Sequence, residues 1–331
     1  MPPALAEDEQ DGADESLNFS RRPFVNETFD RRSFLRRGAV GAAAGTLGVL
    51  CPARVRRALA IEPIGRKTPP RLKLGCAAYS LRKYLDLSSP RMTLEEFVTK
   101  CAEWQADGVE LTEYYFPKPV TPAYVMKLKR HAALCGLDVT GTPIGNNFAL
   151  PAGQERDRQV ASVKSWIDVS ADLGSPAIRI FAGNAPKGIE EPQARKWVVE
   201  CIEACCDTAS KRGVFLAVEN HGGVVATAEG VLEIVKSVSC PWVGVNLDTG
   251  NFHTPDPYGD IERCAPYAVT CQVKTEVFPS GGKKEEADLE RLVAILRKSG
   301  YSGYVTLEYE ASEEPMEAVP KYLKSLRKLV A

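Results

Sequence analysis

From about residue 67 onward, short apolar runs alternate along the chain with longer amphipathic stretches. The apolar runs are rich in Val, Ile, Leu and aromatic residues, which is typical of buried strands. We expect eight strands, at residues 72–80, 108–115, 136–144, 176–183, 214–220, 242–250, 268–277 and 303–310.

The stretches between the expected strands have apolar residues at helical spacing, as in TLEEFVTKCAEWQAD, TPAYVMKLKRHAALC, DRQVASVKSWIDVSADLG and DLERLVAILRKSG. Glycines, which favour helix ends, stand at four of the junctions to the next strand: Gly136, Gly174, Gly213 and Gly300. Strands that alternate with helices in this way predict a parallel sheet.

Residues 67–331 hold these eight units, and a (β/α)8 barrel typically takes about 250 residues. The rival architecture is a doubly wound open sheet, which usually has a glycine-rich phosphate-binding turn after its first strand. The segment GCAAYSLRKY contains no such turn. We therefore predict an α/β protein with a single-domain (β/α)8 TIM barrel at 67–331.

Residues 1–66 have a different character. Residues 1–29 are polar and acidic and indicate disorder. They are followed by DRRSFLRRG and the weakly apolar AVGAAAGTLGVL, an order that resembles a twin-arginine export signal. We expect a periplasmic or otherwise exported protein; the alternative is an amphipathic N-terminal helix of the mature fold. The residues that carry the resemblance are Arg31, Arg32, Phe34 and Leu35.

The charges are balanced, with 42 Lys+Arg against 43 Asp+Glu, so nothing indicates a nucleic-acid partner. No apolar stretch reaches the ~18–20 residues of a membrane span, so stable membrane insertion is not expected. The ten cysteines include no CxxC pair, which argues against a zinc ribbon. We expect them to be buried thiols and leave a disulfide open, as we do homo-oligomerisation.

Polar side chains close four of the apolar runs, where packing alone would favour Val or Ile. In a TIM barrel the functional residues lie at these carboxyl ends of the strands. Three carboxylates brought together there would repel one another unless a cation lay between them. Oxygen donors suit a hard divalent ion, so we expect Mn²⁺, with Mg²⁺, Co²⁺ or Zn²⁺ as alternatives. The four residues are Glu219 in LAVENHGG, Asp248 in VNLDTGNF, Gln272 in CQVKTE and Glu308 in TLEYE.

The series ENHGG, LDTGN, QVK and LEYE resembles the xylose-isomerase-like superfamily of sugar isomerases and epimerases, over about 67–331. The resemblance implies that Glu219, Asp248, Gln272 and Glu308 bind the metal. Most members have His at the strand-seven position, where hydroxypyruvate-isomerase-like members have Gln, as here. Many members also have His where this chain has Asn251, which puts substrate contacts in doubt more than metal contacts.

In that family, a metal that chelates a carbonyl and the neighbouring hydroxyl stabilises an enediolate. Glu219 and Glu308 are our candidates for the pair that removes and returns the proton. We expect the substrate, a free sugar or small hydroxy-carbonyl compound, to contact side chains beside the ligands. A phosphorylated substrate is not expected, because no phosphate cradle follows strands seven and eight. The candidate substrate-binding residues are His221, Asn251, His253 and Lys274.

Several of these residues have a structural interpretation as well. His221 could merely orient a ligand, and Lys274 could be an ion-pair partner. For Arg179 and Glu110, which lie within strands, we favour a buried ion-pair network over substrate contact. Tyr79 and Phe181 are either core residues or an apolar wall of the pocket, and we favour the core.

Two other functions are compatible with the same motifs. One is a metal-dependent lyase acting on 3-oxo-glycosides, which needs the same metal and base. The other is a non-catalytic carbohydrate-binding barrel. An apurinic endonuclease with three zinc ions is excluded, because the chain has only His131, His221 and His253 to supply its many histidine ligands.

Overall fold

The computed structural model describes residues 62–279 and 283–331. Eight parallel strands form one sheet, in the order β3-β2-β1-β10-β7-β6-β5-β4. This confirms the predicted (β/α)8 barrel, with each strand somewhat shorter than its apolar run. The strands are β1 (Leu72–Ala77), β2 (Gly108–Glu110), β3 (Asp138–Gly141), β4 (Ala177–Phe181), β5 (Phe215–Glu219), β6 (Val243–Asp248), β7 (Ala268–Val273) and β10 (Gly303–Leu307).

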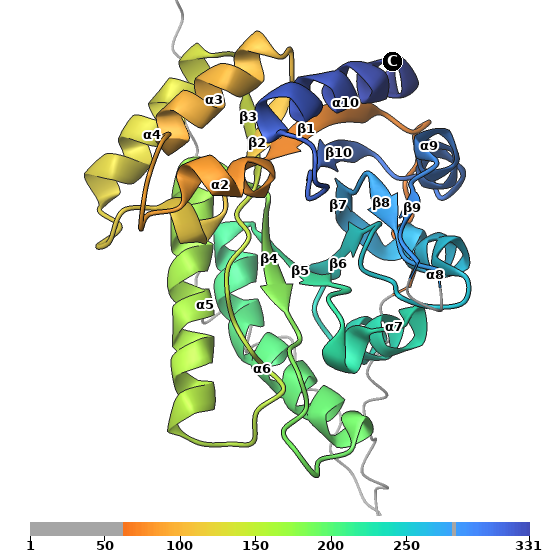
Figure 1. The fold of residues 1–331 in the computed structure, drawn as a ribbon. Helices are drawn as coiled ribbons and strands as arrows, with labels where there is room; N and C mark the ends of the chain where they lie inside the picture. The colour runs from red at the N-terminus through yellow and green to blue at the C-terminus, as the bar shows by residue number, and fades with distance from the viewer. Residues whose placement is uncertain (1–61, 280–282) are drawn as a thin grey trace, which may run out of the picture. The chain divides into compact units, whose positions relative to one another are not determined.

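The barrel closes at two places. The first and last strands pair in register, with Leu72 opposite Gly303 and Cys76 opposite Leu307. Between β3 and β4, closure is made just beyond the end of β3, where the Ile144 amide donates to the Arg179 carbonyl at 3.2 Å. The strands therefore surround one interior, as Figure 1 shows.

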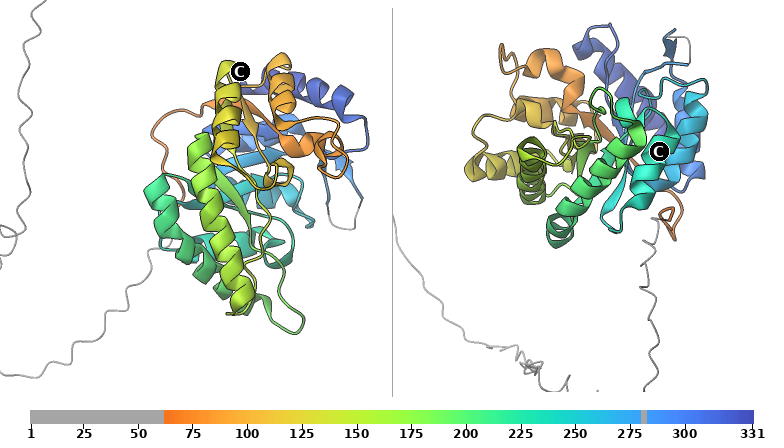
Figure 2. Two further views of the ribbon diagram at one scale, coloured as in Figure 1. Left: turned by 90° about the vertical axis from the view of Figure 1, so that its left-hand side faces the viewer. Right: turned by 90° about the horizontal axis from the view of Figure 1, so that it is seen from below.

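Helices surround the barrel on the outside (Figure 2). They follow the strands in alternation, as the amphipathic stretches predict. Their bounds are α2 (Arg82–Leu85), α3 (Leu94–Glu103), α4 (Pro122–Leu134), α5 (Gln154–Leu173), α6 (Glu191–Arg212), α7 (Ala228–Ser237), α8 (Pro257–Cys264), α9 (Leu289–Lys298) and α10 (Pro315–Val330). Short 3-10 turns lie at Ala78–Leu81, Glu113–Tyr115, Gly223–Val225 and Ala265–Tyr267.

Local sequence signals fix where the helices begin and end. Thr93 caps α3 in a capping box with Glu96, in which each side chain bonds the other's backbone amide. At their C-termini, α5 and α6 end on Gly174 and Gly213, both in the left-handed conformation that glycine adopts without steric cost. These caps turn the chain out of each long helix and directly into the next strand.

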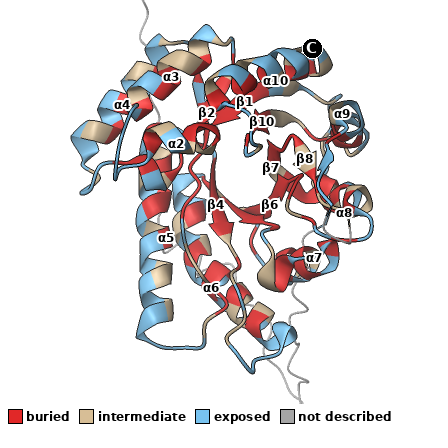
Figure 3. Ribbon diagram, in the orientation of Figure 1, coloured by how far each residue is buried: buried red, intermediate tan, exposed pale blue. Residues whose placement is uncertain are grey.

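Buried residues occupy the strands and the helix faces that pack against them, while exposed residues lie on the outer helix faces (Figure 3). Leu216, Val245 and Val305 on three strands, for example, are fully buried. The nine cysteines of the described residues are free thiols, and seven of them are buried. The expectation of buried thiols is therefore confirmed for most of them.

A small hairpin was not expected from the sequence. Strands β8 (Glu276–Val277) and β9 (Glu285–Glu286) pair antiparallel in the segment between β7 and α9. The pattern predicted β7 to continue to residue 277, but the barrel strand ends at Val273 and the chain turns aside. The hairpin stands at the rim where the carboxyl ends of the barrel strands meet.

The predicted export signal, including Arg31 and Arg32, lies outside the described residues. Contact with the barrel begins slightly before residue 67, since the Ile64 amide donates to the Pro266 carbonyl at 3.0 Å and Arg66 donates to the Ala268 carbonyl at 2.7 Å. Within the part of the chain that the structure covers, no helix has both the length and the apolar composition needed to cross a membrane.

Close packing between β1 and β10 can be tested at Gly75. A Cβ added there would lie 2.6 Å from Thr306 Oγ1 and 3.3 Å from the Thr306 backbone, so the paired strands would have to shift. We expect Gly75→Ala to lower the free energy of unfolding by about 1–3 kcal/mol, measured by urea unfolding. The matched control is Gly65→Ala, which has open space around it and should be near neutral. Equal effects of the two substitutions would contradict this account.

Candidate functional site

The four side chains predicted to bind a metal lie at the rim and are buried. Glu219 and Asp248 are the last residues of β5 and β6, Gln272 is aligned with Asp248 across the β6–β7 ladder, and Glu308 follows β10 directly. Their exposed fractions are 5% or less. Residues two apart on a strand share a face. The strand register therefore places these four side chains on the interior face of the barrel.

Lys274 bridges two members of this group, Asp248 and Glu308. Its Nζ lies 2.6 Å from Glu308 Oε2 and 3.3 Å from Asp248 Oδ2, and it also pairs with Glu310. Burial alone would lower the pKa of this ammonium, but the three carboxylates outweigh burial and raise it well above its usual value. Lys274 therefore stays charged, and it is the cation that links the ends of β6 and β10.

A second buried cation, Arg179 on β4, forms an ion pair with Glu219. Its Nε lies 2.8 Å from Glu219 Oε2, and its guanidinium lies 3.8 Å from the centre of the Phe181 ring. The Asn251 amide donates to the other Glu219 oxygen at 2.9 Å. The structure thus places Arg179 in the buried ion-pair network that the sequence indicated, and it makes Asn251 a partner of Glu219.

Gln272 belongs to a ladder of polar side chains inside the barrel. Its Nε2 donates to Glu110 Oε1 at 2.7 Å, and its Oε1 accepts from Asn246 at 2.6 Å. Thr270 donates in turn to Asn246 at 2.7 Å. Both ends of the Gln272 amide are therefore engaged by the protein, and the amide oxygen would have to turn to meet a metal ion.

The carboxyl groups outnumber the buried cations that serve them. Burial raises the pKa of Asp248 well above its usual value, and repulsion from Glu219 and Glu308 adds to the shift. For Glu308, burial acts in the same direction, but Lys274 outweighs it and lowers the pKa. Burial also raises the pKa of Glu219, against the attraction of Arg179. The site thus has more carboxyl groups than Arg179 and Lys274 can neutralise, and burial favours the protonated form of Asp248 and Glu219.

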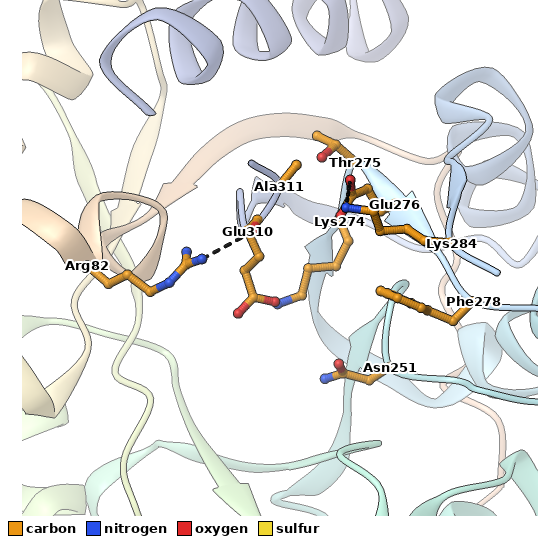
Figure 4. Close-up of a pocket in the computed structure, with 10 residues that line it drawn as sticks. Arg82, Asn251, Lys274, Thr275, Glu276, Phe278, Lys284, Glu310 and Ala311 are labelled. Carbon is orange, nitrogen blue, oxygen red and sulfur yellow. Dashed lines mark hydrogen bonds and ion pairs between the residues drawn. The ribbon is translucent and has the colours of Figure 1, made fainter. Parts of the chain in front are cut away.

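A cavity of about 230 Å³ opens onto these groups. A second cavity, of about 340 Å³, lies next to it, because Lys274 and Glu310 line both cavities (Figure 4). The smaller cavity is lined by Tyr79, Tyr114, Arg179, Phe181, Glu219, His221, Lys274, Glu308 and Glu310. The larger is lined by Arg82, Gly250, Asn251, Lys274, Thr275, Glu276, Phe278, Lys284, Glu310 and Ala311.

The other predicted contacts are distributed around these cavities. His221 is exposed, lines the smaller cavity and lies 4.5 Å from Phe181, ring centre to ring centre. His253 is not among the lining residues; it is exposed and stacks at 4.6 Å on Phe278, which lines the larger cavity. Tyr79 and Phe181 are only half-buried and line the smaller cavity, so our preference for core residues was wrong for both.

The lining residues that sequence reasoning missed include Arg82, Tyr114 and Glu310. Glu310 had a usable signal, since it follows Glu308 by two positions in LEYE and such residues point to the same side of an extended chain. Arg82 follows β1 and donates to the Tyr309 carbonyl at 2.9 Å, a contact that only barrel closure creates. Tyr114 lies in the turn after β2, where the local pattern gives no indication of a pocket.

The residue types of the rim fit a divalent cation. Asp248 Oδ2 is buried and has the Lys274 ammonium as an ion-pair contact at 3.3 Å, and the three carboxylates and one amide offer the oxygen donors that Mn²⁺ or Mg²⁺ prefers. In the present arrangement, however, residues 62–279 and 283–331 contain no group of three or more His, Cys, Asp or Glu side chains placed to hold a metal. The ammonium of Lys274 lies between two of the expected ligands instead.

Fold and site together define a (β/α)8 barrel protein with an acidic pocket, bridged by buried cations, at the carboxyl ends of its strands. The chain belongs to the xylose isomerase-like TIM barrel family, whose model matches residues 98–329. No curated protein sequence matches it significantly.

Solved structures with the same fold include three informative relatives. An L-ribulose 3-epimerase is 18% identical with a TM-score of 0.64, and the match covers 78% of this chain and 94% of that one. The 3-keto-D-glucoside 4-epimerase YcjR from E. coli is 15% identical with a TM-score of 0.59, covering 78% and 99%. The IolI protein with a bound zinc atom is 19% identical with a TM-score of 0.62, covering 78% and 98%. At these identities, the likeness shows the fold.

The buried Glu110 predicts a pH dependence of stability. Burial, with repulsion from Glu308, raises its pKa from 4.5 to about 8. The folded state therefore keeps a proton that the unfolded chain releases. The stabilisation from this proton is complete below pH 4.5 and is lost as the pH rises to about 8, at roughly 1.4 kcal/mol per pH unit.

Glu110→Gln should remove that loss, because the amide cannot ionise. Urea unfolding of EDTA-treated protein should show wild type losing stability relative to the variant between pH 4.5 and about 8, with no further change above. The control is Glu313→Gln, whose side chain is 44% exposed. If the free energies of unfolding of wild type and Glu110→Gln differ by the same amount at every pH, Glu110 is not protonated in the folded protein.

Proposed function

We propose that this protein is a metal-dependent isomerase or epimerase of a free sugar or small hydroxy-carbonyl compound. One observation carries the proposal: two buried carboxylates, Glu219 and Glu308, line a single cavity at the catalytic rim of the barrel. A carbon held between them could lose a proton to one and regain it from the other, through an enediolate of the substrate. The epimerases among the solved relatives support the same class of reaction.

The metal would be held by Glu219, Asp248, Gln272 and Glu308. When bound, such an ion polarises the substrate carbonyl and makes the neighbouring C–H more acidic. We propose Mn²⁺, with Mg²⁺, Co²⁺ and Zn²⁺ as alternatives, from the oxygen donor set. The IolI structure with zinc supports metal use by this fold.

Other residues of the cavity would bind and orient the substrate. Tyr79, Tyr114 and Phe181 present aromatic surface, which suits the apolar faces of a sugar ring, while His221 and Arg179 present donors for its oxygens. The Arg179 contact with Glu219 also fixes the carboxylate against the cavity wall. Positioning of this kind contributes to rate because the reacting groups are held together before the proton moves.

The lyase of 3-oxo-glycosides remains the second candidate because of the double cavity. The space of about 340 Å³ beside the cavity of about 230 Å³ offers room for a group attached to the reacting sugar ring. A relative that acts on a 3-keto-D-glucoside supports this substrate class. A carboxylate, Glu219 or Glu308, would then remove the proton next to the 3-oxo group, the glycosidic C–O bond would break, and the departing oxygen would take up a proton and leave as an alcohol.

Deuterium incorporation from D₂O tests the proton transfer. Purified protein is first analysed for bound metal, then loaded with Mn²⁺ and incubated with a panel of free ketoses and 3-oxo-glycosides. Exchange next to the carbonyl is expected, and Glu308→Gln should slow it by about 10²–10⁴-fold, because a proton carrier is lost. Removal of metal with EDTA should also slow it.

Glu313→Gln is the control, since its exposed side chain lies outside both cavities and exchange should be unchanged. Full exchange by Glu308→Gln would exclude Glu308 as a proton carrier. Metal-loaded protein that binds a sugar but exchanges none of the panel would favour the non-catalytic carbohydrate-binding barrel. Product analysis by NMR separates epimerisation from elimination.

We also propose periplasmic localisation through the twin-arginine route, on the basis of DRRSFLRRG and the apolar segment that follows it. The double variant Arg31→Lys, Arg32→Lys keeps the charge but removes the paired arginines. In a bacterium with this export route, we expect wild type in the periplasmic fraction and the variant in the cytoplasm, by immunoblotting of cell fractions. Equal export of both would contradict the proposed signal.

A further inference from the structure

Lys274 is shared between two kinds of carboxylate. Asp248 and Glu308 are proposed metal ligands, at 3.3 Å and 2.6 Å from its Nζ. Glu310, the third partner, is not a proposed ligand; its side chain is 37% exposed and lines both cavities. One flexible side chain thus connects the expected metal position to the wall of the substrate space.

The Lys274 stem is fitted closely into this position. A Cβ added at Gly250 would lie 2.4 Å from Lys274 Cγ and 2.7 Å from its Cβ, so only glycine leaves room for the stem here. The backbone amide of Lys274 donates to Thr249 Oγ1 at 3.0 Å. The base of the side chain is therefore fixed, while the long aliphatic stem leaves the ammonium free to change partners.

An ammonium and a metal ion cannot occupy this place together. A divalent ion bound by both Asp248 and Glu308 must lie within about 2.0–2.6 Å of an oxygen of each. The Nζ atom already bridges the two carboxylates at 2.6 Å and 3.3 Å. A metal that uses these two oxygens would meet the Lys274 ammonium there, so Lys274 would have to withdraw from them, and Glu310 is the partner that it can keep.

We propose that Lys274 is a resident cation that holds the ligand carboxylates together in the metal-free protein, and that a divalent metal displaces it onto Glu310. This inference depends on the proposed metal site. It explains how the acidic rim stays intact without metal, and it places a cationic side chain against the substrate space when the metal binds. The alternative is a permanent structural ion pair, in which Lys274 stays buried between Asp248 and Glu308.

Chemical labelling of Lys274 separates displacement from a permanent pair. The full-length protein is treated with N-acetoxysuccinimide, with and without Mn²⁺ at one fixed pH, and acetylation is quantified by mass spectrometry. Lys274 is only 7% exposed, so labelling without metal should be slow. We expect Mn²⁺ to raise it several-fold. Lys211, whose side chain is 72% exposed and which lines neither cavity, is the internal reference and should not change.

Metal affinity, measured by calorimetry, gives a second readout. Lys274→Met should bind Mn²⁺ about tenfold more tightly than wild type, because no ammonium has to leave the site. Glu310→Gln should bind it about tenfold more weakly, because the displaced ammonium loses its remaining partner. Lys284→Met is the matched control for a general charge effect, since Lys284 lines the larger cavity but pairs with Glu276. The Mn²⁺ affinity of this variant should differ from that of wild type by less than about twofold.

The outcomes separate this inference from the proposed function. If neither wild type nor Lys274→Met binds Mn²⁺, Mg²⁺, Co²⁺ or Zn²⁺, the proposed metal-dependent function fails, and the displacement fails with it. If metal binds but Lys274 labelling stays constant or falls, the displacement alone is wrong and the metal site stands. The labelling needs no variant, so it decides the matter even if Lys274→Met does not fold.

Discussion

The ammonium of Lys274 lies where β6 and β10 end, 2.6 Å from Glu308 and 3.3 Å from Asp248, and all three side chains are buried. Carboxylates that closely spaced would repel one another strongly in a medium of low polarity. The Lys274 ammonium offsets this repulsion where the two strands end. Much of the arrangement of the site follows from the presence of that charge.

Arg179 meets the same requirement on the opposite side of the cavity. It pairs with Glu219 while its guanidinium lies against the Phe181 ring, and Phe181 in turn contacts His221. The Arg179 side chain thus contacts both a carboxylate and an aromatic ring of the cavity lining. A sugar ring needs both kinds of surface, because it has apolar faces and a rim of hydroxyl groups. The ion pair that stabilises the barrel consequently also shapes the space in which a substrate would lie.

The fold could be predicted almost entirely from the sequence, whereas the site could be predicted only in its composition. Strand and helix periodicity depends on which faces are buried, and that pattern is local, so eight units were recognisable. The strand-end rule then identified Glu219, Asp248, Gln272 and Glu308 as residues of one rim. The β8–β9 hairpin was not predictable, because a long apolar run does not reveal where the chain leaves the barrel.

By itself, the sequence determined the alternation of elements, the helix caps and the identity of the acidic side chains at the strand ends, because each depends on residues near one another in the chain. Only the tertiary structure decided which of them touch. The partnership of Lys274 with Asp248 and Glu308 and the engagement of Gln272 by Glu110 join residues from separate strands. Such contacts depend on strand register and barrel closure, which set distances between side chains that no local pattern encodes.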